Sequence, residues 1–123
     1  MNELKVTLDR GELRPKEKIS GKVSWRVSTP VRYIELRLFW YTIGKGSEDV
    51  GVVDTLRIED VAQAGTRGFS FILPASPYSF SGRLISLVWA VEALVEPGRE
   101  CQRAEFTFAP SGKEVLLYAQ SQG

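Results

Sequence analysis

Hydrophobic and polar residues alternate with a period of two along most of the chain, and this alternation predicts β-strands. In residues 18–27 the alternation is unbroken, so one face of that strand is expected to point to a core and the other to solvent. Its inward set is Ile19, Gly21, Val23, Trp25 and Val27. No long stretch shows the period of an amphipathic helix, so we expect an almost entirely β protein.

Gly, Pro, Ser and Asp residues separate the alternating stretches and mark turns between them. The predicted strands are residues 4–8, 18–27, 31–42, 50–58, 66–73, 84–95, 101–108 and 115–118. Residues 60–67 are predicted to form a loop with room for a single helical turn. Many short strands joined by such turns are typical of an all-β, two-sheet antiparallel β-sandwich of immunoglobulin-like type.

Two of these strands, 31–42 and 84–95, are apolar on both faces toward one end. A sheet with one wet face carries polar side chains there, so something is expected to cover this outer surface. The candidates are the terminal segment 115–118, a second copy of the chain, or a partner protein. We therefore predict a homodimer or a partner-binding face, and its residues are Tyr33, Phe39, Tyr41 and Val88.

The composition is that of an ordinary globular domain: 123 residues, of which 43% are hydrophobic, 11% aromatic and 25% charged. This length predicts one domain, residues 1–123. The net charge is only +1, so the chain as a whole lacks the excess of positive charge typical of nucleic-acid-binding proteins, and we expect no nucleic-acid partner. The first residues do not read as a leader peptide, and the longest apolar run is too short for a transmembrane segment. The expected location is cytoplasmic.

Histidine is absent, which removes the commonest general base and the commonest zinc ligand. The single cysteine, Cys101, cannot form an internal disulfide and is predicted to be a buried or half-buried structural thiol. The acidic pairs at 48–49 and 59–60 lack the spacing of a calcium loop, and Lys45 lacks the context of a phosphate-binding loop. We expect no catalytic residue, no metal and no cofactor.

Two further features are predicted to be structural. Trp25, Trp40 and Trp89 all fall on inward faces, so we expect them to be buried between the sheets rather than exposed as a carbohydrate platform. Pro74 and Pro77 have the spacing of a proline-rich ligand motif, but they join two core strands and are expected to be folded into one end of the sandwich.

Three segments resemble the amino-terminal domain of arrestin-fold proteins, including bacterial sporulation-control relatives. They read LKVTLDRGELRPKEKISGKVSWRV from residue 4, RYIELRLFWYTIGKG from residue 32 and FSFILPASPYSFSGRLISLVWAVEALV from residue 69. The chain departs from the family in having room for one sandwich where arrestins have two in tandem. The phosphate-sensing residues of receptor-binding arrestins have no counterpart that we can place, so phosphoreceptor recognition is not carried over.

The resemblance implies a non-enzymatic intracellular module that works by contact with other proteins, as a scaffold, through a sheet face or a sheet edge. The alternative is a small ligand-binding or carbohydrate-binding β-sandwich, which requires exposed aromatic rings beside convergent polar groups. An enzyme is the least favoured class. A deep polar pocket favours the ligand-binding and enzymatic alternatives, whereas a flat apolar patch or an open sheet edge favours the interaction module.

Overall fold

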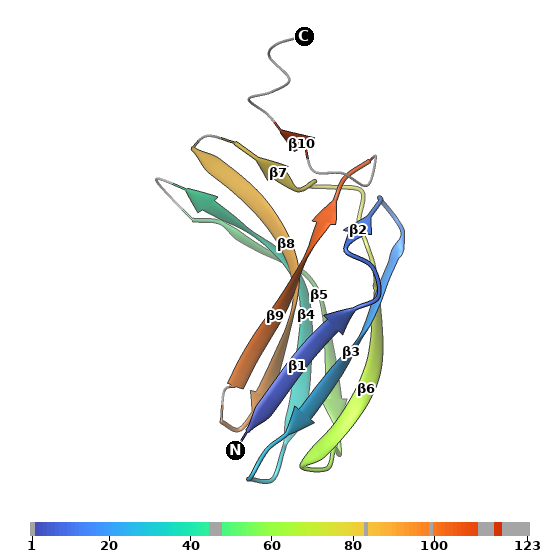
Figure 1. Ribbon diagram of the computed structural model, residues 1–123, viewed down its shortest axis with the longest axis vertical. Coiled ribbons are helices and arrows are strands. Elements are labelled where there is room, and N and C mark those ends of the chain that lie inside the picture. The colour runs from blue at the N-terminus through green and yellow to red at the C-terminus, as the bar shows by residue number, and fades with distance from the viewer. Residues whose placement is uncertain (1, 45–47, 83, 99, 111–114, 117–123) are drawn as a thin grey trace.

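The computed structural model describes residues 2–44, 48–82, 84–98, 100–110 and 115–116, and its strands form two sheets packed face to face (Figure 1). The small sheet has the order β1 (Glu3–Leu8), β3 (Lys18–Arg26), β6 (Ala64–Ile72). The large sheet contains β10 (Val115–Leu116), β7 (Phe80–Ser81), β8 (Ile85–Glu96), β4 (Tyr33–Gly44) and β5 (Val50–Glu59), in that order. It also contains β9 (Glu100–Phe108), which pairs with β8, and β2 (Glu12–Leu13), which pairs with β9. The predicted all-β, two-sheet sandwich is confirmed.

The long strands pair antiparallel, and the two exceptions are very short. In the large sheet β4 lies between β5 and β8, with Phe39 opposite Ala90 and Trp40 opposite Trp89. The parallel pairings are β2 with β9 and β10 with β7, each two residues long. Neither β2 nor β7 was predicted, because a two-residue strand is too short to show a period.

The core lies between the two sheets, where the inward sets of the long strands meet. Trp89 is fully buried and its ring meets Phe108 edge-on, with centroids 5.1 Å apart. Its indole N–H donates to the Pro77 carbonyl at 2.7 Å, while Trp25, 6% exposed, donates to the Ala62 carbonyl at 2.8 Å. Each buried indole therefore has the hydrogen-bond partner that burial requires.

Trp40 is less buried than the alternation predicts. It is half-buried and packs against the core from β4, beside Gly51 of the edge strand β5. A Cβ atom built on Gly51 would lie 2.2 Å from the Trp40 ring, so only glycine leaves room for the indole there.

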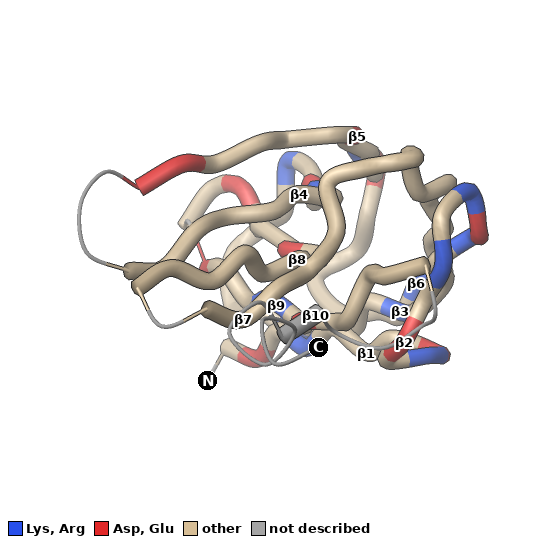
Figure 2. The backbone as a smooth tube through the Cα atoms, turned by 90° about the horizontal axis from the view of Figure 1, so that it is seen from above, with Lys and Arg blue, Asp and Glu red and all other residues tan. Residues whose placement is uncertain are grey.

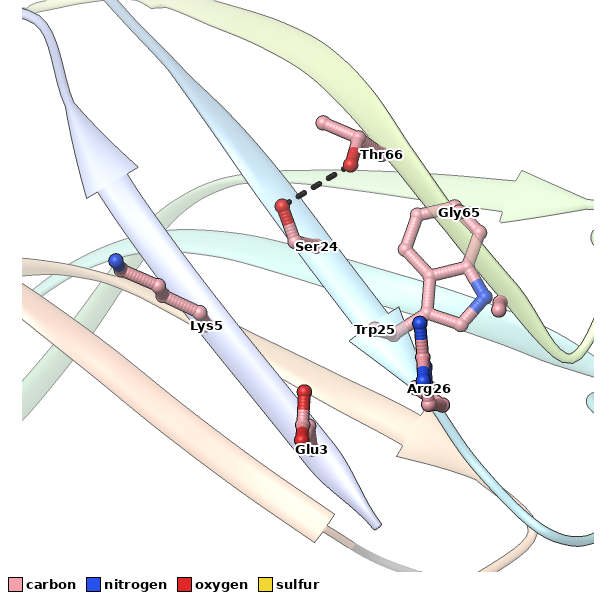
Figure 3. Close-up of a pocket in the computed structure, with 8 residues that line it drawn as sticks. Glu3, Lys5, Ser24, Trp25, Arg26, Gly65 and Thr66 are labelled. Atoms are coloured by element: carbon pink, nitrogen blue, oxygen red, sulfur yellow. Dashed lines mark hydrogen bonds between the residues drawn. The ribbon is translucent and has the colours of Figure 1, made fainter.

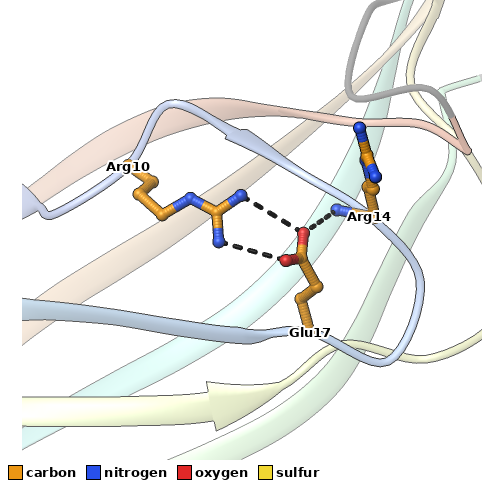
Figure 4. A network of polar contacts seen from close by, with 3 residues as sticks. All are labelled: Arg10, Arg14 and Glu17. Atoms are coloured by element: carbon orange, nitrogen blue, oxygen red, sulfur yellow. Dashed lines mark hydrogen bonds and ion pairs between the residues drawn. The ribbon is translucent and has the colours of Figure 1, made fainter.

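The turn before β3 is held by one carboxylate (Figure 4). Glu17 accepts a hydrogen bond from the Arg10 guanidinium at 3.1 Å and another from the Arg14 backbone N–H at 2.6 Å. These contacts, the one to Arg10 first, lower the pKa of Glu17 from its ordinary value. Between them, Pro15 and Lys16 form a turn closed by a bond from the Glu17 N–H to the Arg14 carbonyl.

The loop predicted at residues 60–67 is shorter than expected. Strand β5 continues to Glu59 and β6 begins at Ala64, so only residues 60–63 connect them and no helical turn forms. Asp60 adopts a positive φ of 56°, a conformation that Asp tolerates better than most residues. The short connection places β5 at the edge of one sheet and β6 at the edge of the other.

The large sheet extends past the small one at one end (Figure 1). There the end of β4 and the start of β5 project as a hairpin arm beyond β1, β3 and β6, and Ile43 and Val50 on this arm are 53% and 64% exposed.

Within the described part of the chain, no helix is long and apolar enough to cross a membrane.

Candidate functional site

Three of the four predicted contact residues meet on the outer face of the large sheet. Tyr41 lies directly opposite Val88, and Phe39 lies opposite Ala90 one step further along the same two strands. The rings of Phe39 and Tyr41 stack, with centroids 5.7 Å apart and planes inclined by 25°. Val88 and Tyr41 are half-buried, whereas Phe39 is only 6% exposed.

The fourth residue, Tyr33, lies at the other end of β4. The rise per residue of a β-strand puts it about 20 Å from Phe39. It belongs to a polar cluster, because the Arg57 guanidinium lies 4.0 Å from its ring centroid. Arg57 also contacts Glu35 at 3.2 Å, and Arg37 contacts the same carboxylate at 2.6 Å. Burial pushes the pKa of Glu35 up, but the two arginines outweigh it and hold that pKa below its ordinary value.

A neighbouring arginine covers the aromatic pair. Arg103 of β9 places its guanidinium carbon 5.2 Å from the Phe39 centroid and 4.9 Å from the Tyr41 centroid. It is fixed by an ion pair to Glu92 at 3.2 Å, and the Tyr41 hydroxyl donates to Glu105 beside it. Partial burial, and then the bond to Glu105, raises the pKa of Tyr41, so its hydroxyl stays a donor. Part of the predicted exposed surface is thus closed by charged side chains.

Exposed aliphatic side chains continue this surface along the hairpin arm, and the sequence analysis did not identify them. Ile43, Val50 and Val52 are 53%, 64% and 55% exposed. We use "hairpin patch" for the apolar set on this face: Phe39, Tyr41, Ile43, Val50, Val52 and Val88. A shallow hollow of about 300 Å³ lies over it, lined by Phe39, Tyr41, Thr42, Ile43, Glu48, Asp49, Val50 and Arg103.

A β-bulge explains why the valines face outward. Leu38 pairs with Asp54 but Phe39 pairs with Val52, so Val53 is an extra residue without a partner on β4. The extra residue reverses the facing of everything before it in β5. Val50 and Val52 therefore join Phe39 and Tyr41 outside. Alternation alone would have placed them inside.

The terminal segment, one of the three candidates for covering this surface, lies elsewhere as far as the structure describes it. Val115 and Leu116 form β10, which pairs with β7 at the edge of the sheet, on the far side of β8 from β4. Residues 117 and 118 lie outside the described residues.

Among the described strands, β5 leaves an open sheet edge next to the hairpin patch. It is the last strand in the order of the large sheet, and nine of its ten residues are at least partly exposed. Val53 and Leu56 on this strand are 39% and 38% exposed, in addition to the two patch valines. Unpaired backbone groups along such an edge are available to another strand.

Cys101 is exposed, so the prediction of a buried or half-buried thiol was wrong. The strand β9 places it on the outer face beside Glu92, not in the core. Partial burial, and then the Glu92 carboxylate, raises the pKa of Cys101 to about 11, which leaves the thiol protonated. Within the described residues no three or more Cys, Asp or Glu side chains converge as a metal site.

The aromatic side chains offer little support for the carbohydrate-binding alternative. Trp25 and Trp89 are buried, Trp40 is half-buried, and every other aromatic ring among the described residues is buried or half-buried. The motif around Pro74 and Pro77 is also folded into the sandwich end, since both prolines are half-buried and the Pro77 carbonyl binds Trp89.

Comparison with known proteins identifies the fold. The crystal structure of Spo0M, a sporulation control protein from Bacillus subtilis, matches with a TM-score of 0.64 at 16% sequence identity. The match covers 87% of this chain and 49% of Spo0M, so the chain spans about half the length of that protein. The chain has a Spo0M-like, arrestin-type fold, as its sequence predicted. No protein-family model matches the chain, and no curated protein matches it in sequence.

Proposed function

We propose that this arrestin-fold domain is a non-enzymatic, intracellular protein-interaction module that binds a protein partner, or a second copy of itself, through the hairpin patch. The observation that carries the proposal is the cluster of exposed aliphatic side chains on the projecting arm. Ile43, Val50 and Val52 are each more than half exposed, and they adjoin a half-buried Tyr41. Contiguous apolar surface of this kind marks interaction sites on soluble proteins.

The composition of the patch also fits a protein interface. Interface cores are enriched in aromatic residues and Arg, and the patch supplies Phe39 and Tyr41 with Arg103 already held over their rings. Preformed stacking lowers the entropy that a partner must remove on binding. The hollow over the patch is shallow, and its lining combines apolar side chains with Glu48, Asp49 and Arg103, which suits a docked side chain of a partner.

The fold is consistent with this role. Spo0M is described as a sporulation control protein, and a control function exerted through contacts requires a surface rather than an active site. The open edge of β5 lies beside the patch, so a partner strand there would share both backbone pairing and side-chain contacts.

The test compares two substitutions of the same chemistry. Val52→Asp places a charge in the patch, and Ile72→Asp places one at a residue of similar exposure, 60%, on the other sheet. Tagged wild-type protein is used to capture binding proteins from a membrane-cleared lysate of its own cells, and sedimentation velocity measures self-association. We expect Val52→Asp to weaken the partner or the dimer contact at least about tenfold, which is 1.4 kcal/mol, and Ile72→Asp to leave it intact.

Equal urea midpoints for the two variants would show that both remain folded. The proposal fails if the wild type stays monomeric at high concentration and Val52→Asp retains the same bound proteins as Ile72→Asp.

A further inference from the structure

The outer face of the small sheet is strongly cationic. It carries one carboxylate, Glu3, and four exposed cations: Lys5 on β1 and Lys18, Lys22 and Arg26 on β3. Four positive charges less one negative charge give this face +3. Since the whole chain carries +1, the rest of it carries −2. None of the four cations forms an ion pair with another described residue.

These charges form a regular row. The outward residues of β3 alternate cation and hydroxyl, from Lys18 through Ser20, Lys22 and Ser24 to Arg26. The row is about 26 Å long at the rise of a strand. Its neighbours add more hydroxyls, because Thr7 lies opposite Lys22 and Thr66 lies opposite Ser24. Cations and hydroxyls both donate hydrogen bonds to anionic oxygens.

The face is open to a broad, flat partner. In Figure 1 β1, β3 and β6 form the near layer and no described strand lies in front of them. Figure 2, seen from above, places these strands on one side of the molecule and β4 and β5 on the other. A surface that touches the small sheet therefore avoids the net negative remainder of the chain.

One end of the row contains a hollow of about 440 Å³ (Figure 3). Its floor includes the hydroxyls of Ser24 and Thr66, which are 3.2 Å apart, and its rim includes Lys5 and Arg26. A single phosphate or carboxylate group entering it would meet two cations and one hydroxyl donor, because one of the two hydroxyl protons already serves the bond between Ser24 and Thr66. Glu3 also lines the hollow and opposes such a group.

We propose that the outer face of the small sheet docks on a membrane surface rich in anionic phospholipid, with the hollow receiving one headgroup. The residues on it favour lipid over a protein partner, because Lys and Ser are depleted in protein interfaces and the face has no aromatic side chain. Lysines near an anionic leaflet attract it without close packing. Ile72, opposite Lys18 and 60% exposed, adds one apolar side chain for insertion between headgroups.

The test is co-sedimentation of the full chain with vesicles of phosphatidylcholine, with or without phosphatidylserine, at low and high salt. We expect binding only to the anionic vesicles, weakened by salt. Each cation is worth about 1 kcal/mol near such a surface, a factor of about five, so Lys22→Glu/Arg26→Glu should lower the partition coefficient at least about tenfold. Glu3→Gln should raise it severalfold, a gain that misfolding would not produce.

The matched control is Arg14→Glu/Arg32→Glu, which changes the net charge equally at two exposed residues outside β1, β3 and β6. We expect it to bind within about threefold of wild type. Absence of binding to anionic vesicles, an equal loss in the control, or an unchanged Glu3→Gln would overturn the proposal. Soluble polyglutamate, bound with the same dependence on Lys22 and Arg26 while vesicles are not, would assign the face to an acidic polypeptide instead.

Discussion

Individual arginines reduce the solvent exposure of the aromatic rings on the outer face of the large sheet. Arg103 closes over Phe39 and Tyr41, and Arg57 closes over Tyr33, each also contacting a carboxylate. A guanidinium on an aromatic face keeps its charge in water while its plane excludes water from the ring. This explains how Phe39 is only 6% exposed on a face with no second sheet over it.

Such coverage is invisible to sequence reasoning. The period-two pattern identified the outward aromatic residues of β4, because facing is a local property of a strand. It gave no sign of Arg103, which comes from β9, more than sixty positions away, and reaches the rings only through the pairing of β8 with β4 and β9. Cys101 was misplaced for a different reason: it was judged by its residue type, whereas alternation with the buried Phe106 and Phe108 puts it on the outer face of β9.

Cys101 provides a prediction at this scale. Its thiol pKa of about 11 lies above that of a free cysteine, near 8.5, so less thiolate is present at any pH below about 11. At pH 8 we expect alkylation by iodoacetamide to be at least about tenfold slower in the folded chain than in urea, after allowing for the higher nucleophilicity of a more basic thiolate. Mass spectrometry of timed samples measures the rate.

Glu92→Gln removes the negative charge beside the sulfur and should speed the folded-state reaction severalfold, whereas Glu96→Gln on the same strand should not. A folded-state rate equal to that in urea would show that the thiol is not perturbed.

At the scale of elements, the pairing of β1 with β3 depends on a glycine. A Cβ atom at Gly21 would lie 2.1 Å from the Thr7 carbonyl oxygen and 2.9 Å from the Phe69 ring, so the strands meet closely because no side chain intervenes. At Gly68 on β6 the nearest atom to such a Cβ is 3.8 Å away. The two glycines therefore differ in whether the fold needs them.

We expect Gly21→Ala to lower the free energy of unfolding by about 2–3 kcal/mol, because backbone on both strands must shift. Gly68→Ala should leave the free energy of unfolding unchanged or raise it by about 0.5–1 kcal/mol, because alanine lowers the conformational entropy of the unfolded chain. Urea unfolding of both variants measures the difference. If the two variants changed the free energy of unfolding equally, the backbone at Gly21 would accommodate a side chain without loss of stability.

The strands were predicted correctly where hydrophobic and polar residues alternate over a long stretch. The facing of the side chains was missed where one extra residue interrupts the alternation. Strands β3, β4 and β8 lie within one or two residues of their predicted bounds, because a buried face leaves a strong period. In β5 the extra residue at Val53 moves Val50 and Val52 to the other face, and no sequence signal marks that bulge. Of the hairpin patch, only Phe39, Tyr41 and Val88 were therefore predicted.

The whole molecule combines a predicted fold with surfaces that the sequence left unassigned. Turn spacing and inward tryptophans were enough for the sandwich, because two one-sided sheets have few other ways to bury their apolar faces. The positive charge on the outer face of the small sheet was hidden by a net charge of +1. This charge can be recognised only once the pairing of the strands shows which lysines lie on the same face of the sheet.

The unequal lengths of the two sheets have a consequence for how the molecule opens. In the middle of β4 the inward side chains Ile34, Leu36 and Leu38 are fully buried between the sheets, while near the end of the strand Ile43 is 53% exposed. Local opening at the arm exposes little new apolar surface, so it requires much less free energy than global unfolding.

Amide hydrogen exchange measured residue by residue should therefore form a gradient along β4. We expect protection close to the global limit at Leu36 and Leu38, falling by at least about a hundredfold by Ile43, which corresponds to about 2.7 kcal/mol. Uniform protection from Ile34 to Ile43 would contradict this. A gradient would mean that the arm melts and re-forms many times during one lifetime of the native core, so whatever docks on the hairpin patch also sets how long the arm stays closed.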